Sequence, residues 1–225
     1  MPDQPLLSTV KKLVRTLTKF HVIGQHYIPD QGGLLLTTNH LSRLDTPFLM
    51  TITHRTDLVA IVAKKYQKIR FFKWVLEKIG TMVWMDRENT DFSAIREAMT
   101  YMRSGMIVGI APEGTRNRDS IGLMEGKQGA ALLAERAKVP VLPAAIIGSE
   151  KVNHYWMRLK RPPVTIRVGE PYHLPPMDRE NRQAWLTSCT DEIMCQIAAL
   201  LPPEYRGVYT GHPRLNELLG EKTGD

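Results

Sequence analysis

Residues 34–45 of this chain read Leu34-Leu35-Leu36-Thr37-Thr38-Asn39-His40-Leu41-Ser42-Arg43-Leu44-Asp45. The apolar run follows a pair of glycines and predicts a short buried strand over residues 34–38. The polar residues after it lead to Thr46 and Pro47, which suit the N-cap and the first position of a helix over residues 47–53. A strand that feeds a helix through a short polar loop is typical of an α/β fold.

The same alternation of short apolar runs and helical periods continues along the chain. Further strands are predicted over residues 58–63, 81–85, 106–111, 141–147 and 164–168. Helices are predicted over residues 68–79, 91–103, 128–137 and 181–201. This order favours a mostly parallel, mixed sheet flanked by helices in a single α/β domain. With 225 residues, 43% of them hydrophobic, the chain is long enough to bury a full-sized core.

Two end segments, residues 1–20 and 202–225, flank the predicted domain of residues 21–201. Residues 5–20 predict an amphipathic helix, with Leu6, Val10, Leu13, Val14, Leu17 and Phe20 on one face and Lys11, Lys12, Arg15 and Lys19 mostly on the other. Such a helix either packs its apolar stripe into the core or lies in the headgroup region of an acidic membrane. Pro, Gly and charged residues after residue 201 predict a C-terminal surface tail.

The formal net charge of +7 points to anionic partners such as phosphorylated metabolites, nucleic acid or an acidic lipid surface. No window approaches the roughly 18 to 20 apolar residues of a membrane-spanning helix. The amino terminus lacks the features of a secretory signal, so we expect none. The only two cysteines, Cys189 and Cys195, fall on different faces of a predicted helix. That spacing argues against a disulfide or a metal pair and fits a reducing, cytoplasmic setting.

His40 and Asp45 form the first candidate pair for chemistry. In open α/β sheets ligands bind beyond the carboxyl ends of the strands, which is where His40 falls. Histidine has the unperturbed pKa nearest neutrality, so it suits a general base for an alcohol. Across a loop, Asp45 can turn back, accept a hydrogen bond from the imidazole and fix its tautomer. Taken alone, the pair is more simply explained by chance, with Asp45 only capping a helix.

A second polar turn leaves a later predicted strand and reads Ala111-Pro112-Glu113-Gly114-Thr115-Arg116. Gly114 lets the backbone approach a ligand, Thr115 offers a hydroxyl, and Arg116 offers a planar fork for phosphate. Glu113 is placed to orient Arg116 or a substrate hydroxyl. Arg87 also follows a strand, so Arg87 and Arg116 predict a shared anion site.

Three other kinds of site are disfavoured. The run Gly122-Leu123-Met124-Glu125-Gly126-Lys127 is one residue short of the P-loop spacing, and Gln128 replaces the Ser or Thr that would hold magnesium. No serine lies in a G-x-S-x-G elbow, which argues against an α/β-hydrolase. The remaining histidines show no metal-ligand spacing: His21, His26, His54, His154, His173 and His212.

Together these segments resemble the glycerolipid acyltransferase family, typified by 1-acyl-glycerol-3-phosphate acyltransferase, over roughly residues 20–175. The family's N-H-x4-D motif matches at Asn39, His40 and Asp45, and its P-E-G-T-R motif matches at residues 112–116.

Two further motifs of the family match at residues 83–87 and 139–143, and its K-x-G lies before the second of these at Lys127 and Gly129. The chain departs from the pattern in two places. The glycine usual before the 83–87 motif comes one position early, at Gly80, and the aromatic residue usual before the lysine is a glycine here.

The resemblance implies the reaction as well as the fold. His40 would be the general base that takes the proton from the free hydroxyl of a lysophospholipid, most simply 1-acyl-glycerol-3-phosphate, to give phosphatidic acid. Asp45 would orient the base, and the hydroxyl oxygen would attack an acyl thioester directly, without an acyl-enzyme. No metal or cofactor is implied. Acyl-CoA or an acylated carrier protein would be the co-substrate, and the sequence leaves that choice open.

The resemblance also implies roles for the second turn. Arg87 and Arg116 would hold the phosphate of the acceptor, Gly114 and Thr115 would shape the pocket, and Lys127 would add positive charge.

Because the implied acceptor is a lipid, the protein is expected to be peripheral, on the inner, cytoplasmic face of an anionic membrane, with no nucleic-acid partner. Several apolar residues are candidates for an acyl groove or a membrane-facing edge, although core packing is the favoured interpretation of each: Phe71, Phe72, Trp74, Met82 and Trp84. Two alternatives stay open. One is a different lysophospholipid or a neutral alcohol as acceptor, and the other is a non-catalytic protein that binds lipid or nucleic acid through its charge.

Overall fold

The structure, a computed structural model, describes residues 4–86, 91–117 and 120–220. Within these ranges it forms one seven-stranded sheet in the order β1-β7-β6-β2-β5-β3-β4. The strands are β1 (Lys19–Ile23), β2 (Leu34–Thr38), β3 (Leu58–Ala63), β4 (Thr81–Met85), β5 (Ile107–Ile110), β6 (Val141–Ile147) and β7 (Pro163–Val168). Strands β2 to β6 run parallel, β7 is antiparallel to β6, and β1 is parallel to β7. The predicted mostly parallel α/β sheet is confirmed, and its last two strands on one side, β7 and β1, run in the opposite direction.

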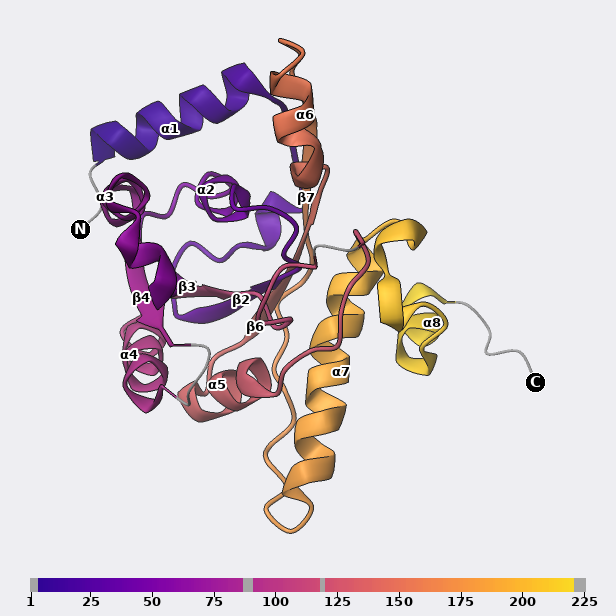
Figure 1. Cartoon of the computed structure of the whole chain (residues 1–225). Coiled ribbons are helices and arrows are strands. Elements are labelled where there is room, and N and C mark those ends of the chain that lie inside the picture. Colours follow the sequence, from indigo (N-terminus) through magenta and orange to yellow (C-terminus); the bar gives the residue numbers. More distant parts are fainter. Residues whose placement is uncertain (1–3, 87–90, 118–119, 221–225) are drawn as a thin grey trace.

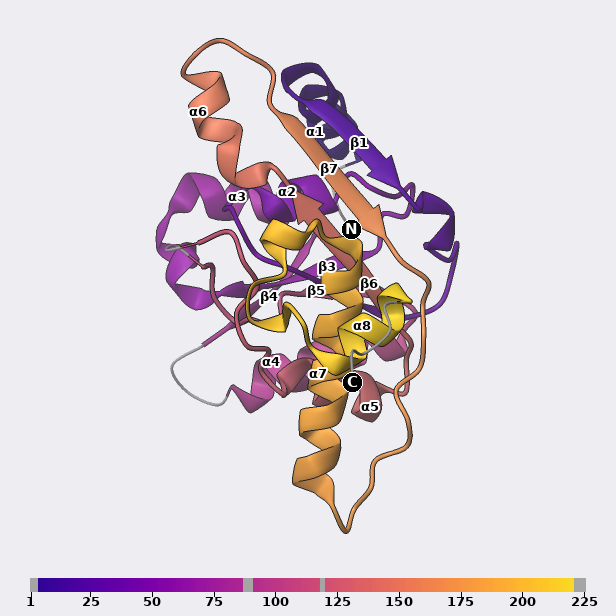
Figure 2. The ribbon, with the colours of Figure 1, turned by 90° about the vertical axis from the view of Figure 1, so that its right-hand side faces the viewer.

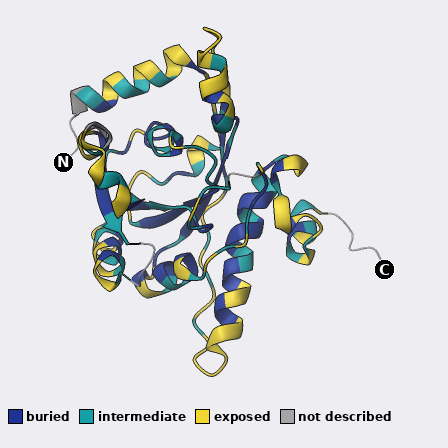
Figure 3. Ribbon diagram, in the orientation of Figure 1, coloured by how far each residue is buried: buried dark blue, intermediate teal, exposed yellow. Residues whose placement is uncertain are grey.

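Helices cover both faces of this sheet (Figure 1). One layer contains α1 (Gln4–Leu17), α2 (Asp45–Leu49) and α3 (Arg70–Ile79), and the other contains α4 (Phe92–Arg103), α5 (Gly129–Ala137) and α7 (Arg182–Leu200). Two short helices, α6 (Val152–Trp156) and α8 (Pro213–Leu219), complete the chain. Each strand contributes side chains to both layers, because successive side chains point to opposite faces of the sheet. On β2, Leu34 and Leu36 pack with α1 to α3, whereas Leu35 packs with α4, α5 and α7. Figure 3 shows the buried residues concentrated along the sheet and the inner side of α7.

The amino-terminal helix is shorter than predicted and is followed by a strand that the sequence did not predict. Helix α1 ends at Leu17, and Phe20 belongs to β1, where exposed and half-buried residues alternate with the period of a strand. Leu7 is buried in the core, with Leu6, Val10 and Val14 packed beside it. The core-packing alternative therefore holds for this stripe, while Leu13 is 53% exposed on the same helix. No helix in the described ranges is long and apolar enough to cross a membrane.

The carboxyl-terminal segment packs on α7, whereas we expected a surface tail from residue 202 onward. Tyr205, Tyr209 and Leu215 are buried, and α8 lies against α7. The hydroxyl of Tyr209 accepts a hydrogen bond from the backbone N–H of Gly126 at 3.0 Å. The polar composition of the segment concealed these three large side chains, whose burial depends on contacts far away in sequence. Residues 221–225 lie outside the described part of the chain.

Helix α2 begins two residues earlier than predicted, at Asp45. Thr46 is therefore inside the helix, and Leu44 occupies the cap position without a side-chain hydrogen bond. Pro47 falls third in the helix, still within the first turn, where a missing backbone N–H is tolerated. The shift matters for function because it puts the carboxylate of Asp45 at the very start of the helix.

A buried arginine ties together the amino-terminal ends of the central strands. The guanidinium of Arg55 donates to the carboxylate of Asp57 just before β3 and to the carbonyl oxygen of Gly32 before β2. It also donates to the carbonyl oxygens of Pro29 and Gly105, the latter before β5. The hydrogen bonds from this guanidinium hold the pKa of Asp57 below its usual value of 3.8.

Replacing Arg55 with Met should lower the free energy of unfolding by about 3 kcal/mol, because it leaves Asp57 and three carbonyl oxygens without their donor. Chemical denaturation measures this change, with Arg96→Met, at an exposed site on α4, as the control expected within about 0.5 kcal/mol of the wild type. The pKa of Asp57 is lowered by folding, so the difference between wild type and Arg55→Met should be complete at neutral pH. It should shrink as the pH falls below 3.8. A difference below about 1 kcal/mol at neutral pH would contradict this role.

Candidate active site

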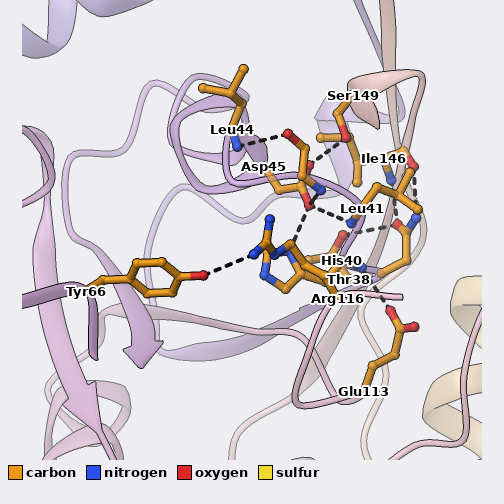
Figure 4. A network of polar contacts seen from close by, with 12 residues as sticks. Thr38, His40, Leu41, Leu44, Asp45, Tyr66, Glu113, Arg116, Ile146 and Ser149 are labelled. Atoms are coloured by element: carbon orange, nitrogen blue, oxygen red, sulfur yellow. Dashed lines mark hydrogen bonds and ion pairs between the residues drawn. The ribbon is translucent and has the colours of Figure 1, made fainter. Parts of the chain in front are cut away.

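Polar residues gather where the central strands end. His40 follows β2, Tyr66 lies in the 3-10 helix η2 (Lys64–Lys68) after β3, and Arg116 lies in the turn after β5. Ser149 follows β6. Because these four strands are parallel, their carboxyl ends meet at one edge of the sheet, and Figure 4 shows the four side chains close together there.

Asn39 fixes the point at which the chain leaves the sheet. Its buried side-chain amide donates to the carbonyl oxygen of Ile146 at 2.9 Å and accepts from the N–H of the same residue at 2.8 Å. The side chain thus makes the pair of hydrogen bonds to β6 that backbone groups make within a sheet. The backbone is then free to turn at His40.

The imidazole of His40 and the carboxylate of Asp45 meet as predicted. Nδ1 of His40 lies 2.8 Å from Oδ2 of Asp45, and the same oxygen accepts the backbone N–H groups of Leu41 and Ser42 at 2.8 Å each. The side chain of Asp45 is 3% exposed and that of His40 is 20% exposed. The carboxylate therefore lies inside the protein while the imidazole reaches the surface of the site.

This contact assigns the tautomer of the imidazole. An ionised carboxylate only accepts hydrogen bonds, so Nδ1 of His40 carries the proton that it shares with Asp45. In the neutral ring the other nitrogen, Nε2, is then an acceptor. The pair can take a proton from a hydroxyl group at Nε2 and stabilise the resulting imidazolium through Asp45.

Ser149 completes the set of donors around Asp45, although the sequence analysis did not single it out. Its buried hydroxyl donates to Oδ1 of Asp45 at 2.6 Å. The two residues are 104 positions apart, so only the register of β2 against β6 brings them together. The sole signal available was the position of Ser149 just beyond a predicted strand.

Glu113 joins the two polar loops of the site through backbone contacts. Its Oε1 accepts the backbone N–H of His40 at 2.9 Å, and its Oε2 accepts the N–H of Met124 at 3.1 Å. We expected Glu113 to orient Arg116 or a substrate hydroxyl, but the carboxyl group is buried and both its oxygens hold main-chain groups. Burial raises the pKa of Glu113 to about 7, although the two N–H groups partly oppose this effect.

Two cations flank the imidazole. Arg116 donates from Nη2 to the hydroxyl oxygen of Tyr66 at 3.1 Å, and both residues line a small pocket with His40 and Arg43. Arg43 was missed in the sequence, although its place between the predicted base and its carboxylate partner could have indicated it. Positive charge beside a proton acceptor suits a substrate that carries both an anion and a hydroxyl group.

The other predicted anion-binding residues have different environments. Gly114 has a positive φ of 73°, and a β-carbon there would lie within 3.0 Å of three side-chain atoms of Lys127. The glycine thus lets the Lys127 side chain cross the turn, while Thr115 is exposed on it. Arg87 lies outside the described residues.

An apolar pocket extends from His40 between α2 and the sheet. It is lined by residues of β2, β3, β5 and α2, among them Leu36, Leu49, Met50, Leu58 and Gly109. Gly109 widens this pocket, because a β-carbon there would lie in it, 3.7 Å from the carbonyl oxygen of Val59 and 3.9 Å from the side chain of Leu36. The pocket offers an aliphatic chain an apolar path that ends at the imidazole.

The apolar residues singled out in the sequence lie elsewhere. Met82 is buried and Trp84 half-buried in the core layer of α1 to α3, whereas Trp74 is 52% exposed on α3. None of these three lines the apolar pocket. The side chains of Phe71 and Phe72 lie outside the described part of the structure.

Comparisons with known proteins agree with this geometry. Residues 19–147, more than half of the chain, match the acyltransferase family. The 1-acyl-sn-glycerol-3-phosphate acyltransferase of Bacillus subtilis is 29% identical over 157 residues, which cover 68% of this chain and 73% of the relative. The enzyme of that name from Helicobacter pylori is 30% identical over 125 residues, covering 55% of this chain and 52% of the relative. The chain thus spans about half the length of the latter protein.

A solved structure has the same fold. The crystal structure of the 1-acyl-sn-glycerophosphate acyltransferase PlsC from Thermotoga maritima superposes with a TM-score of 0.59 and 22% sequence identity. The superposition covers 83% of this chain and 78% of that one. The matched family region contains β1 to β6 and with them the His40–Asp45 pair and Arg116. The chain therefore belongs to the acyltransferase family of enzymes.

Proposed function

We propose that this protein transfers an acyl group from an acyl thioester to the free hydroxyl of 1-acyl-glycerol-3-phosphate, giving phosphatidic acid. The observation that carries the proposal is the meeting of an oriented imidazole, a cationic pocket and an apolar pocket at His40. The names of the Bacillus subtilis and Helicobacter pylori relatives support this choice of acceptor.

In the proposed reaction His40 acts as the general base. Nε2 takes the proton from the acceptor hydroxyl while its oxygen attacks the thioester carbonyl carbon. Collapse of the tetrahedral intermediate breaks the carbon–sulfur bond, and the proton on Nε2 passes to the departing thiolate. Asp45 keeps Nδ1 protonated throughout, so each cycle returns the imidazole to its starting tautomer.

The two cations beside the base would select a phosphorylated acceptor. Arg116 and Arg43 share the small pocket with His40, so a phosphate bound there would hold its neighbouring hydroxyl group near Nε2. The side chain of Lys127, which crosses the turn at Gly114, is proposed to add positive charge, and Arg87 is proposed to join them. A neutral alcohol would leave these cations without a counter-ion.

The apolar pocket would hold an acyl chain with its reactive end at His40. The thioester is proposed to be carried by coenzyme A or by an acyl carrier protein, with no metal or other cofactor. Because the acceptor is a lipid, the enzyme is proposed to act as a peripheral protein at the cytoplasmic, anionic face of a membrane.

A transfer assay on the purified protein tests the function directly. Lysophosphatidic acid should be the best acceptor in a panel with other lysophospholipids and a monoacylglycerol, each offered with both types of donor. A preference for monoacylglycerol would contradict the phosphate site. Absence of transfer to every acceptor with both donors would contradict the enzyme.

Replacing His40 with Ala should lower kcat by about 10²–10⁴-fold, because no other base takes its place. Asp45→Asn should cause a smaller loss, on the order of 10²-fold, since the imidazole stays but its tautomer is no longer fixed. Steady-state rates measure both, and circular dichroism checks that the variants fold. A His40→Ala variant with wild-type kcat would remove His40 from the mechanism.

Arg116→Ala should raise the KM for lysophosphatidic acid by about 10-fold or more, because a charge-assisted hydrogen bond to phosphate is lost. The KM for the donor should stay within about twofold of the wild-type value. Activity on an uncharged acceptor should be the same in the variant as in the wild type. Arg96→Ala, far from the site, serves as the matched control. Equal increases in both KM values would argue against phosphate binding by Arg116.

Ser149→Ala should lower kcat by about tenfold with little change in either KM, because Asp45 loses the donor to Oδ1 and holds the imidazole less firmly. Ser149→Thr keeps a hydroxyl group and should recover most of the activity. If both variants lose activity equally, then the cause is packing around Ser149 and the hydrogen bond has no special role.

Gly109→Val should shorten the acyl chains that the enzyme accepts, because the new side chain enters the apolar pocket beside Leu36. Transfer of long chains should fall by about tenfold, while short acyl donors, which do not reach position 109, should react as before. Valine suits a strand, so stability should change little. Equal loss of activity with long and short acyl donors would mean that the acyl chain does not bind in this pocket.

A further inference from the structure

Five apolar side chains at one end of the molecule face solvent. Trp156, Met157 and Leu159, at the end of α6 and in the turn after it, are 37%, 79% and 98% exposed. Leu13 and Leu17, one turn apart on α1, are 53% and 40% exposed. We call these five residues the apolar ledge. Exposed leucine and tryptophan side chains gathered in one place mark a surface that binds a protein, a membrane or a ligand.

The ledge is one surface because hydrogen bonds join its two parts. The indole N–H of Trp156 donates to the carbonyl oxygen of Leu17 at 3.2 Å. Arg161 donates from Nη2 to the carbonyl oxygens of Arg15 and Thr18 at 2.7 and 2.6 Å. Figures 1 and 2 both show α1 and α6 side by side at the same end of the molecule.

The tip of the turn holds its apolar side chain outward in a strained conformation. Leu159 has a φ of 53°, in the left-handed region that non-glycine residues rarely adopt. Its backbone N–H donates to the carbonyl oxygen of Trp156 at 2.9 Å, and the N–H of Lys160 donates to that of Tyr155 at 3.0 Å. A glycine would fit this turn more easily, yet the chain carries a leucine that contacts almost nothing in the protein.

The two segments that carry the ledge have charge of one sign. The chain has 23 acidic residues, yet none falls in residues 4–29 or 151–169. Exposed Arg158, Lys160 and Arg161 surround Leu159. An anionic surface is therefore the partner that this charge fits.

The topology places the ledge at the same edge of the sheet as the site. Because β7 is antiparallel to β6, the connection between them never crosses to the other edge, and it starts next to Ser149. Strand β1 begins beside the start of β7, with Lys19 opposite Pro163, so α1 also ends at this edge. The ledge and the carboxyl ends of β2 and β6 therefore share one edge of the sheet.

We propose that the apolar ledge inserts into the headgroup region of an anionic lipid bilayer, with Trp156, Met157 and Leu159 entering the apolar boundary and the neighbouring cations meeting lipid phosphates. This inference rests on the proposed function, because it gives the site a fixed position relative to a lipid acceptor. Leucine and methionine side chains as exposed as Leu159 and Met157 favour lipid over an acidic soluble protein, whose surface would offer them little apolar contact.

The first test places a probe at the tip of the ledge. Both native cysteines are buried, so Leu159→Cys can be labelled selectively with the polarity-sensitive fluorophore NBD in the full-length protein. The vesicles contain phosphatidylcholine with about 30% phosphatidylglycerol, which makes their surface anionic. Binding to them should shift the fluorophore's emission to the blue and raise its intensity about two-fold or more. Lipid-borne nitroxide should quench it. Phe92→Cys on α4, a helix in the opposite layer of the sheet from α1, is 71% exposed; it is the matched control and should not respond.

The second test removes the apolar tips. Met157→Ser combined with Leu159→Ser should weaken partition onto the same vesicles about tenfold or more in flotation, whereas Phe92→Ser should change it less than about twofold. Arg158→Gln with Lys160→Gln should weaken it about fivefold per cation at low salt. Point substitutions are preferable to deletion of residues 1–20, because Leu7 belongs to the core.

The outcomes separate this inference from the proposed function. Water-soluble short-chain substrates need no bilayer, so the ledge variants should keep wild-type transfer between them. A label at position 159 that ignores vesicles, or that responds to a soluble acidic protein and not to vesicles, would overturn the lipid ledge. If the wild-type protein transfers no acyl group between the soluble substrates, the proposed reaction is wrong. The fluorescence result on the ledge would still be valid.

Discussion

The buried carboxylate of Asp45 is the group on which the site depends. An ionised carboxylate removed from water is costly unless donors surround it, and here four donors do so: the imidazole of His40, the N–H groups of Leu41 and Ser42, and the hydroxyl of Ser149. Satisfying that one group fixes the loop after β2, the start of α2 and the orientation of the His40 imidazole together. The same set of contacts ties the loop to β6, so the geometry of the pair depends on the sheet.

The amino-terminal and carboxyl-terminal ends of the central strands have different roles. At the amino-terminal ends of the strands, Arg55 joins the segments before β2, β3 and β5. At the carboxyl ends, the same strands are followed by His40, Tyr66 and Arg116, which line one pocket. The scaffold therefore fixes the strand positions at one end while the loops at the other end carry the polar residues of the candidate site.

Local sequence was sufficient for strands β2 to β7, for most of the long helices and for the central pair, and insufficient for what lies around that pair. Short apolar runs mark β2 to β6, and the short loop between His40 and Asp45 made their contact predictable. Ser149 reaches Asp45 only through the register of β2 and β6, and the backbone partners of Glu113 likewise depend on tertiary structure. Strand β1 was hidden because its alternating exposure resembles the end of an amphipathic helix.

The carboxyl group of Glu113 has a consequence for how this family tolerates change. One oxygen holds the backbone of the histidine loop and the other holds the segment after the arginine turn, so the two motifs share a single support. Substitutions in the two motifs should therefore be epistatic, with combined effects that differ from the sum of the separate ones. Grafting either motif alone into another scaffold would leave one of the two main-chain contacts of Glu113 unmade.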